Sequence, residues 1–181
     1  MAAIVAGDIL TKYSTTAGAA GNSTAGTAAG SLGKYVSTTQ WTGGALNDLF
    51  DDISGDENAA SESEYRCIFV HNANAANVYE NVVVWLSAEV GGGANVTIGA
   101  DTTAASALAN ASAQALTIAN EDTAPGGVTF TGPTTKATGI SLGNIGIGQV
   151  KAFWIKRTAT NSAALSADGV TFSIAGDTGS L

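Results

Sequence analysis

The chain is poor in the residues that build disulfides and zinc sites. Its 181 residues include one cysteine, Cys67, and one histidine, His71. A single cysteine excludes an intrachain disulfide, and one cysteine with one histidine cannot supply the usual ligands of a structural zinc ion. We therefore expect no disulfide, no zinc site and a protein that is made in a reducing cytoplasm.

Positive charge and long apolar runs are also scarce. Lys and Arg together number 7 against 15 Asp and Glu, which gives a formal net charge of −8. Binding to a nucleic-acid backbone needs clustered cations, so DNA and RNA are poor partners for this composition. No run of about 18 apolar residues occurs, and the opening MAAIVAGDILTKY lacks the pattern of a signal peptide. We expect a soluble protein with no nucleic-acid partner and no membrane partner.

The residues that could support catalysis do not have suitable spacing. On one strand, Cys67 and His71 would share a face but lie roughly 13 Å apart at about 3.3 Å per residue, beyond the reach of a nucleophile and its base. Cys67 is better interpreted as a small buried hydrophobic residue, and His71 as the end of a strand. The sequence has no phosphate-binding glycine motif and no feature that locates a substrate cleft. We predict that the protein is not an enzyme and has no cofactor.

Small residues dominate the region before residue 34. Residues 14–33, STTAGAAGNSTAGTAAGSLG, contain one bulky apolar side chain, Leu32. Such a segment cannot offset the entropy of its own ordering, so we predict an extended Gly/Ala/Thr-rich attachment arm over residues 1–42 and a β-sandwich domain over residues 43–181. The alternative is a disordered tail. The candidate partner-binding anchors are the apolar residues that flank the small-residue run: Ile4, Val5, Ile9, Leu10, Tyr13, Tyr35 and Trp41.

Acidic residues gather directly after this arm. Residues 48–64 hold seven of the 15 acids. Apolar residues recur with helical spacing from Leu46 to Ile53, which predicts a short helix that ends near Gly55. The ligand spacing of calcium-binding loops is absent, so we interpret the segment as a solvated cap and turn. The alternative is a structural cation that is held by some of Asp51, Asp52, Asp56 and Glu57.

The remaining chain has the period of two that is typical of strands. Seven short runs are separated by turn-forming residues: YRCIFVH, NVVVWLSA, NVTIG, QALTIA, VTFT, QVKAFWIKR and GVTFSIAG. In the last run, Val170, Phe172 and Ile174 alternate with smaller or polar residues. The strings GGGAN and GNIGIG have the composition of hairpin turns. The predicted fold is mainly β, an antiparallel, jelly-roll-like β-sandwich with an extended N-terminal arm.

Two tryptophans lie in runs that are apolar on both faces. Trp85 and Trp154 belong to VVVWL and AFWIK, and a second sheet can cover only one face of each. We expect the other face to be buried in a homo-oligomer, most simply a trimer.

Several strings together resemble a known family. These are LFDDISGDENAASESEYRCIFVHN, VVVWL, ANEDTAPGGVTFTGPTTKATGISLGNI, GQVKAFWIKRT and the closing GDT, over a little more than half of the chain. In combination they resemble a family of tailed-bacteriophage virion structural proteins. Asn144 and Gly146 depart from the acid and proline that the family has before the Gly-Gln pair. The small-residue arm has no counterpart in the resemblance.

The resemblance implies a component of the virion that is assembled in the host cytoplasm. We expect a capsid decoration or cement protein that binds the outer head surface through its N-terminal arm and associates with itself through its β-sandwich. Its partner would be the major capsid protein or another virion protein. The alternative is a tail or head–tail connector component, such as an adaptor or a fibre-associated module. Copy number per virion separates these two possibilities.

Overall fold

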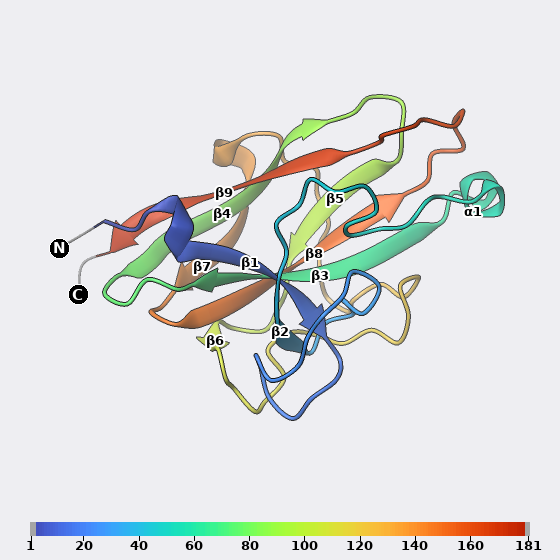
Figure 1. The fold of residues 1–181 in the computed structure, drawn as a ribbon. Coiled ribbons are helices and arrows are strands. Elements are labelled where there is room, and N and C mark those ends of the chain that lie inside the picture. Colours follow the sequence, from blue (N-terminus) through green and yellow to red (C-terminus); the bar gives the residue numbers. More distant parts are fainter. Residues whose placement is uncertain (1–2, 180–181) are drawn as a thin grey trace.

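Two antiparallel sheets packed against each other form a β-sandwich, as the sequence predicts (Figure 1). The structure, a computed structural model, describes residues 3–179. The larger sheet has the strand order β2-β1-β3-β8-β5, with β6 beside β8, and the smaller sheet has the order β7-β4-β9. The elements are η1 (Ala6–Asp8), β1 (Ile9–Thr15), β2 (Tyr35–Gln40), α1 (Gly55–Ala60), β3 (Ser63–Asn72), β4 (Val78–Glu89), β5 (Asn95–Ala100), β6 (Ser106–Ala107), η2 (Lys136–Thr138), β7 (Ile140–Ile145), β8 (Gln149–Thr158) and β9 (Val170–Gly179).

The apolar runs at the centre of the larger sheet pack on both of their faces. Strands β3 and β8 pair along most of their length, from Ser63 opposite Thr158 to His71 opposite Val150. Successive side chains of a strand point to opposite faces, so each strand supplies two separate apolar stripes. The stripe facing the smaller sheet joins the inner core, which comprises Trp41, Leu49, Ile68, Val70, Tyr79, Val82, Val84, Leu86, Val96, Ile98, Leu142, Ile145, Phe153 and Ile155.

The other stripe of the larger sheet forms a second apolar cluster, the outer core. It comprises Val36, Tyr65, Cys67, Phe69, Ala115, Ile118, Val150, Ala152 and Trp154. Loop residues Leu32, Leu108, Leu116, Val128 and Phe130 pack against it. The chain therefore covers both faces of the larger sheet by itself, and Trp154 is fully buried. Trp154 therefore needs no second copy of the chain to cover its face. Trp85 on β4 is half-buried.

The small-residue segment lies on the sandwich rather than extending from it. Strand β1 pairs with β3 on one side and with β2 on the other, so residues on both sides of the segment belong to the larger sheet. Between them, the Gly33 amide donates to Ser14 Oγ over 2.9 Å, and the Ser31 carbonyl accepts from the Cys67 amide over 2.8 Å. The buried residues Trp41 and Leu49, on either side of the predicted division at residue 42, both belong to the inner core. Residues 1–2 of the predicted arm lie outside the described residues.

The helix predicted over residues 46–53 is not formed, and the helix α1 begins where that prediction ended. The carbonyl groups of Asp48 and Leu49 accept hydrogen bonds from the Tyr13 hydroxyl and from Arg66 Nε instead of from helical amides. Helix α1 starts after Ser54, whose hydroxyl accepts from the Glu57 amide while the Glu57 carboxylate accepts from the Ser54 amide. This is a capping box, and the Ser-x-x-Glu spacing is visible in the sequence.

Two of the seven predicted strands are wrong. QALTIA and VTFT contribute only isolated bridges, Gly33 to Thr117 and Ile98 to Thr131. The sequence prediction also missed β1, β2 and β7, because their runs are polar or interrupted by glycine. The strings GGGAN and GNIGIG are not hairpin turns, since each lies where the chain passes from the smaller sheet to the larger one.

Candidate functional site

The predicted anchors do not form one surface. Tyr35 and Trp41 are buried, at 6% and 9% exposure. Trp41 Nε1 donates to Asp48 Oδ2 over 3.1 Å, and its ring meets the Phe172 ring edge-on at a centroid distance of 5.7 Å. The Tyr13 hydroxyl donates to the Asp48 carbonyl over 2.6 Å. These aromatic side chains hold the chain to its own sandwich.

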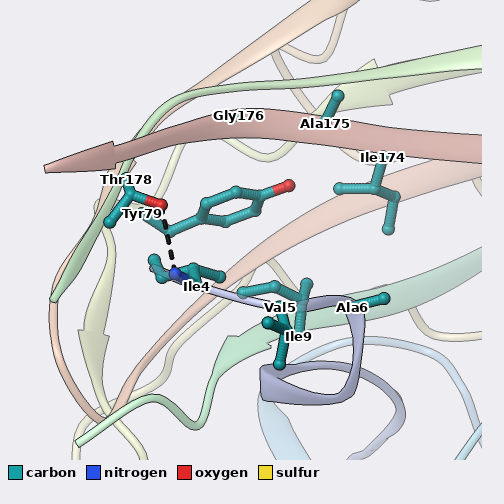
Figure 2. Close-up of a pocket in the computed structure, with 9 residues that line it drawn as sticks. All are labelled: Ile4, Val5, Ala6, Ile9, Tyr79, Ile174, Ala175, Gly176 and Thr178. Atoms are coloured by element: carbon teal, nitrogen blue, oxygen red, sulfur yellow. Dashed lines mark hydrogen bonds between the residues drawn. The ribbon is translucent and has the colours of Figure 1, made fainter. Parts of the chain in front are cut away.

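Three other anchors gather at the beginning of the chain. Ile4, Val5 and Ile9 line a groove of about 370 Å³ whose opposite wall comes from β9 and Tyr79 (Figure 2). The Ile4 amide donates to Thr178 Oγ1 over 3.1 Å, which fixes the N-terminal segment beside the end of β9. Val5 is 62% exposed, whereas Leu10 is half-buried on β1. We call this feature the N-terminal groove; its lining residues are Ile4, Val5, Ala6, Ile9, Tyr79, Ile174, Ala175, Gly176 and Thr178.

The N-terminal groove is apolar in character. Its walls are mainly aliphatic, and Tyr79 is the one titratable side chain among the described residues that line it. Burial and then the Asp177 carboxylate raise the pKa of the Tyr79 phenol, so this group stays neutral near pH 7. The groove can therefore accept an apolar side chain, and its chemistry is that of a contact surface.

A second candidate site is a cluster of charged side chains at the opposite end of β3. Arg66 is 98% buried as a side chain and donates from Nε to the Leu49 carbonyl over 3.2 Å. Its terminal nitrogen pairs with Glu121. Arg157 on β8 pairs with Glu64 and also donates to the Asp51 carbonyl. We call these residues the arginine cluster.

The arginine cluster attaches the acidic loop to the larger sheet. The Phe50 ring lies beneath both guanidinium groups, with its centroid 5.3 Å from Arg66 Cζ and 4.7 Å from Arg157 Cζ. Burial raises the pKa of the Glu64 carboxyl, and the hydrogen bond and charge of Arg157 oppose that effect. Because each guanidinium also bonds a loop carbonyl, the cluster positions the loop between Trp41 and α1. Its geometry is that of a structural clamp.

Cys67 and His71 occupy the same face of β3, and both are buried. Cys67 is fully buried in the outer core, and burial raises the pKa of its thiol well above the ordinary value. Cys67 is therefore the small buried residue that the sequence predicts. His71 is also buried, and desolvation followed by the charge of Lys12 lowers the pKa of its imidazole. His71 lies next to the last residue of β3, as predicted.

Two of the four acids considered for a cation have other contacts. Asp51 Oδ1 lies 3.5 Å from a terminal nitrogen of Arg157, and Glu57 caps α1. Within residues 3–179, no group of three His, Cys, Asp or Glu side chains is arranged to hold a metal ion. No helix in this part of the chain is long and apolar enough to cross a membrane.

Sequence reasoning missed a buried polar site at the edge of the outer core. Asp101 Oδ2 accepts from Trp154 Nε1 over 2.7 Å and from the Leu116 amide over 2.9 Å. Asp101 Oδ1 accepts from the Thr103 amide over 2.7 Å, which closes a local turn. An acid placed directly after a strand and before two threonines signals this turn. The contact with Trp154 spans more than fifty residues and has no local signal.

Comparison of the chain with protein families, with curated proteins and with solved structures found no match.

Proposed function

We propose that this protein is a structural component of a tailed-bacteriophage virion, specifically a capsid decoration protein. It binds the outer surface of the head through its first residues and presents the β-sandwich to the exterior. The major capsid protein is its partner. The sequence resemblance suggests the role in the virion, and the exposure of the anchor residues suggests which of them contact the head.

The observation that carries the proposal is that the resembling strings meet in space. The arginine cluster takes Phe50 and Asp51 from LFDD, Glu64 and Arg66 from SEYRC, and further residues from ANEDTAPGG and KAFWIKRT. Segments that are up to 106 residues apart in sequence thus supply one connected cluster. This convergence supports the interpretation of the strings as one folded module, which is how the resemblance presents them.

The seven predicted anchors differ in how far their side chains are exposed. Tyr35 and Trp41 are buried in the sandwich, so their side chains are already occupied by contacts within the chain. Val5 is the most exposed of the seven anchors and borders the N-terminal groove. A capsid subunit that contacts Val5 would bury an apolar side chain that now faces solvent. We therefore assign head binding to the segment around Val5.

The experiment measures binding to heads that lack this protein. Purified chain is added to such heads, and the bound copies are counted after sedimentation. A decoration protein saturates at on the order of hundreds of copies, set by the symmetry of the shell. Saturation at about six or twelve copies would instead indicate a tail or head–tail connector position. Absence from the mature virion would overturn the proposal in either form.

A matched pair of variants tests the assigned surface. Val5→Asp places a charge on the exposed anchor and should weaken head binding at least about tenfold, since burying an unpaired carboxylate in a contact is costly. Val90→Asp makes the same change on another valine, 43% exposed, in the turn after β4, and should bind like the parent chain. Equal binding by both variants would contradict the assignment to Val5.

A further inference from the structure

We propose that two copies of this chain associate through β9, whose free edges pair antiparallel to join two smaller sheets into one. Strand β9 lies at an edge of the smaller sheet, with β4 as its only neighbour among the described strands (Figure 1). This association is a property of the folded chain and does not depend on the proposed role in the virion.

The direction of the β4 amides shows which β9 groups point outward. The Leu86 amide donates to the Pro133 carbonyl over 2.8 Å, on the side of β4 away from β9. Main-chain groups alternate along a strand, so Trp85 and Val83 face β9 and pair with Ser173 and Ala175. Ser87 Oγ donates to the Thr171 carbonyl over 3.2 Å, which agrees with this alternation.

The main-chain groups of Phe172 and Ile174 therefore point away from β4. No described residue outside the smaller sheet forms a hydrogen bond with the main chain of either residue. The sequence from Val170 to Ala175, VTFSIA, contains no charge, proline or glycine. Edge strands often carry charged residues or proline that prevent pairing with another chain, and β9 has neither between Val170 and Ala175. Its free donors and acceptors are available to a second strand.

A second copy of β9 can pair with this edge in the register that is centred on Ser173. Antiparallel pairing centred on Ser173 places Phe172 opposite Ile174 of the second copy, and the outward groups of both residues then face each other. An aromatic residue opposite a β-branched residue is a favourable cross-strand pair. A shift by one residue would oppose outward groups with inward ones, so the hydrogen-bond pattern rejects it. The same contact forms twice around a two-fold axis, which closes the assembly at two copies.

The N-terminal groove is positioned to receive a side chain from the second copy. In the same register, Val170 of the second copy lies opposite Gly176, on the face of the sheet where Tyr79 and Ile4 lie (Figure 2). A side chain at Gly176 would collide with the Tyr79 ring, so this ring covers the bare backbone of Gly176 and Val170 of the second copy would lie beside it. Val170 is half-buried and belongs to the margin of the inner core in its own subunit. Pairing would extend that core across the two-fold axis.

The charges at the ends of β9 are compatible with self-pairing. Asp177 would lie opposite Gly169 of the second copy, and Asp168 opposite Thr178, so no two carboxylates face each other. Asp177 already accepts a hydrogen bond from Asn81 Nδ2, and Asp168 accepts from the Ala94 amide. A strand with a different sequence would have to reproduce both the register and this charge pattern. A second copy of this chain has the same sequence and therefore meets both conditions. We assign a second copy as the occupant of this edge.

The register is tested by a cysteine at its centre. Ser173 would face Ser173 of the second copy as a non-hydrogen-bonded pair, with Cα atoms about 4.5 Å apart, within the range of about 4.4–6.8 Å for disulfides. Ser173→Cys should therefore give a covalent dimer on mild oxidation of the full chain. Thr171→Cys on the same face is the matched control, since four residues separate the two sulfurs along the strands, roughly 13 Å at about 3.3 Å each. Cys67 is fully buried and stays reduced in both variants.

Cross-linking of Ser173→Cys alone supports the register, whereas equal cross-linking of both variants, or of neither, overturns it. A second measurement uses the protein without oxidation. The parent chain should sediment as a dimer, and Ser173→Lys should raise the dissociation constant at least about tenfold because two ammonium groups then face each other. Thr129→Lys, on an exposed loop residue, makes the same charge change and should leave the dimer intact. A parent chain that stays monomeric overturns the proposal and leaves the edge for a strand of another protein.

Discussion

At the scale of single residues, the arginine cluster shows how buried charge organises a loop. The Arg66 guanidinium bonds the Leu49 and Tyr65 carbonyls and the Glu121 carboxylate, so its donors are distributed over three segments. A buried cation needs hydrogen-bond partners, and each of the three Arg66 guanidinium nitrogens donates one hydrogen bond. Glu121 remains 38% exposed, so it can return to water if its partner is lost. The Leu49 carbonyl can return to water only if the loop moves away from the larger sheet.

Replacement of Arg66 should therefore weaken the fold. Arg66→Ala should lower the free energy of unfolding by about 3 kcal/mol, since it removes one partner of a buried ion pair and leaves two carbonyls without their donor. The measurement is the midpoint of urea denaturation. Lys136→Ala removes one exposed cation and serves as the control, with an expected change within about 0.5 kcal/mol. A loss below about 1 kcal/mol for Arg66→Ala would show that the cluster is not a clamp.

At the scale of elements, the small-residue segment acts as a closely fitting cover. Gly33 has φ of +91°, and a side chain there would place its Cβ 1.9 Å from the Leu116 carbonyl oxygen and 3.1 Å from the Trp154 ring. The backbone of the segment can reach the larger sheet only because glycine, alanine and serine leave room for it. The composition that predicted poor ordering in isolation thus allows close packing in the folded chain.

A single methyl group should disturb this cover. Gly33→Ala should destabilise the fold by about 3 kcal/mol or more, because alanine meets both a disfavoured backbone conformation and a main-chain collision. Gly91→Ala is the matched control: a Cβ there meets no atom within 4 Å, and its backbone conformation is one that alanine adopts. Thermal unfolding followed by circular dichroism compares the two variants. Equal melting temperatures would mean that the segment yields easily and contributes little to the outer core.

At the scale of the whole molecule, the sandwich includes strands from near both ends of the described residues. Strand β1 fills the position between β2 and β3 in the larger sheet, and β9 forms an edge of the smaller sheet. The inner core contains Trp41, and the outer core contains Val36, both from the segment predicted as an arm. Loss of the N-terminal region would expose both cores at once, so we expect the chain to unfold cooperatively.

Truncation separates the two roles of the N-terminal region. A chain that starts at Gly43 lacks β1 and β2, leaves the edge of β3 unpaired, and should be unfolded or aggregated. A chain that starts at Ile9 keeps both strands and should remain folded while it loses Val5 and the attachment that we assign to it. Far-UV circular dichroism and sedimentation distinguish these states. A folded, monodisperse product from Gly43 would mean that the region is an independent arm after all.

Some features of this protein follow from the sequence by itself. The alternation of Val170, Phe172 and Ile174 predicts a strand with one apolar face, and the runs YRCIFVH and AFWIK predict central strands with two. Such patterns are local, because neighbouring side chains on a strand alternate whatever the rest of the chain does. The sandwich class and the burial of Cys67 follow from the same period. The Ser54 and Glu57 pair also marks the start of α1, although the helical spacing before it was misleading.

Only the tertiary structure decided which partners these elements receive. The helix expected before Gly55 gave way to a loop because donors from Tyr13, Arg66 and Arg157 reach its carbonyl groups. The small-residue segment became part of the sandwich because Asn110, nearly ninety residues away, accepts a hydrogen bond from the Gly21 amide. Contacts between residues so far apart in sequence produce no repeating pattern that could predict them. For the same reason, the sequence does not indicate that loops pack over Trp154 on the larger sheet.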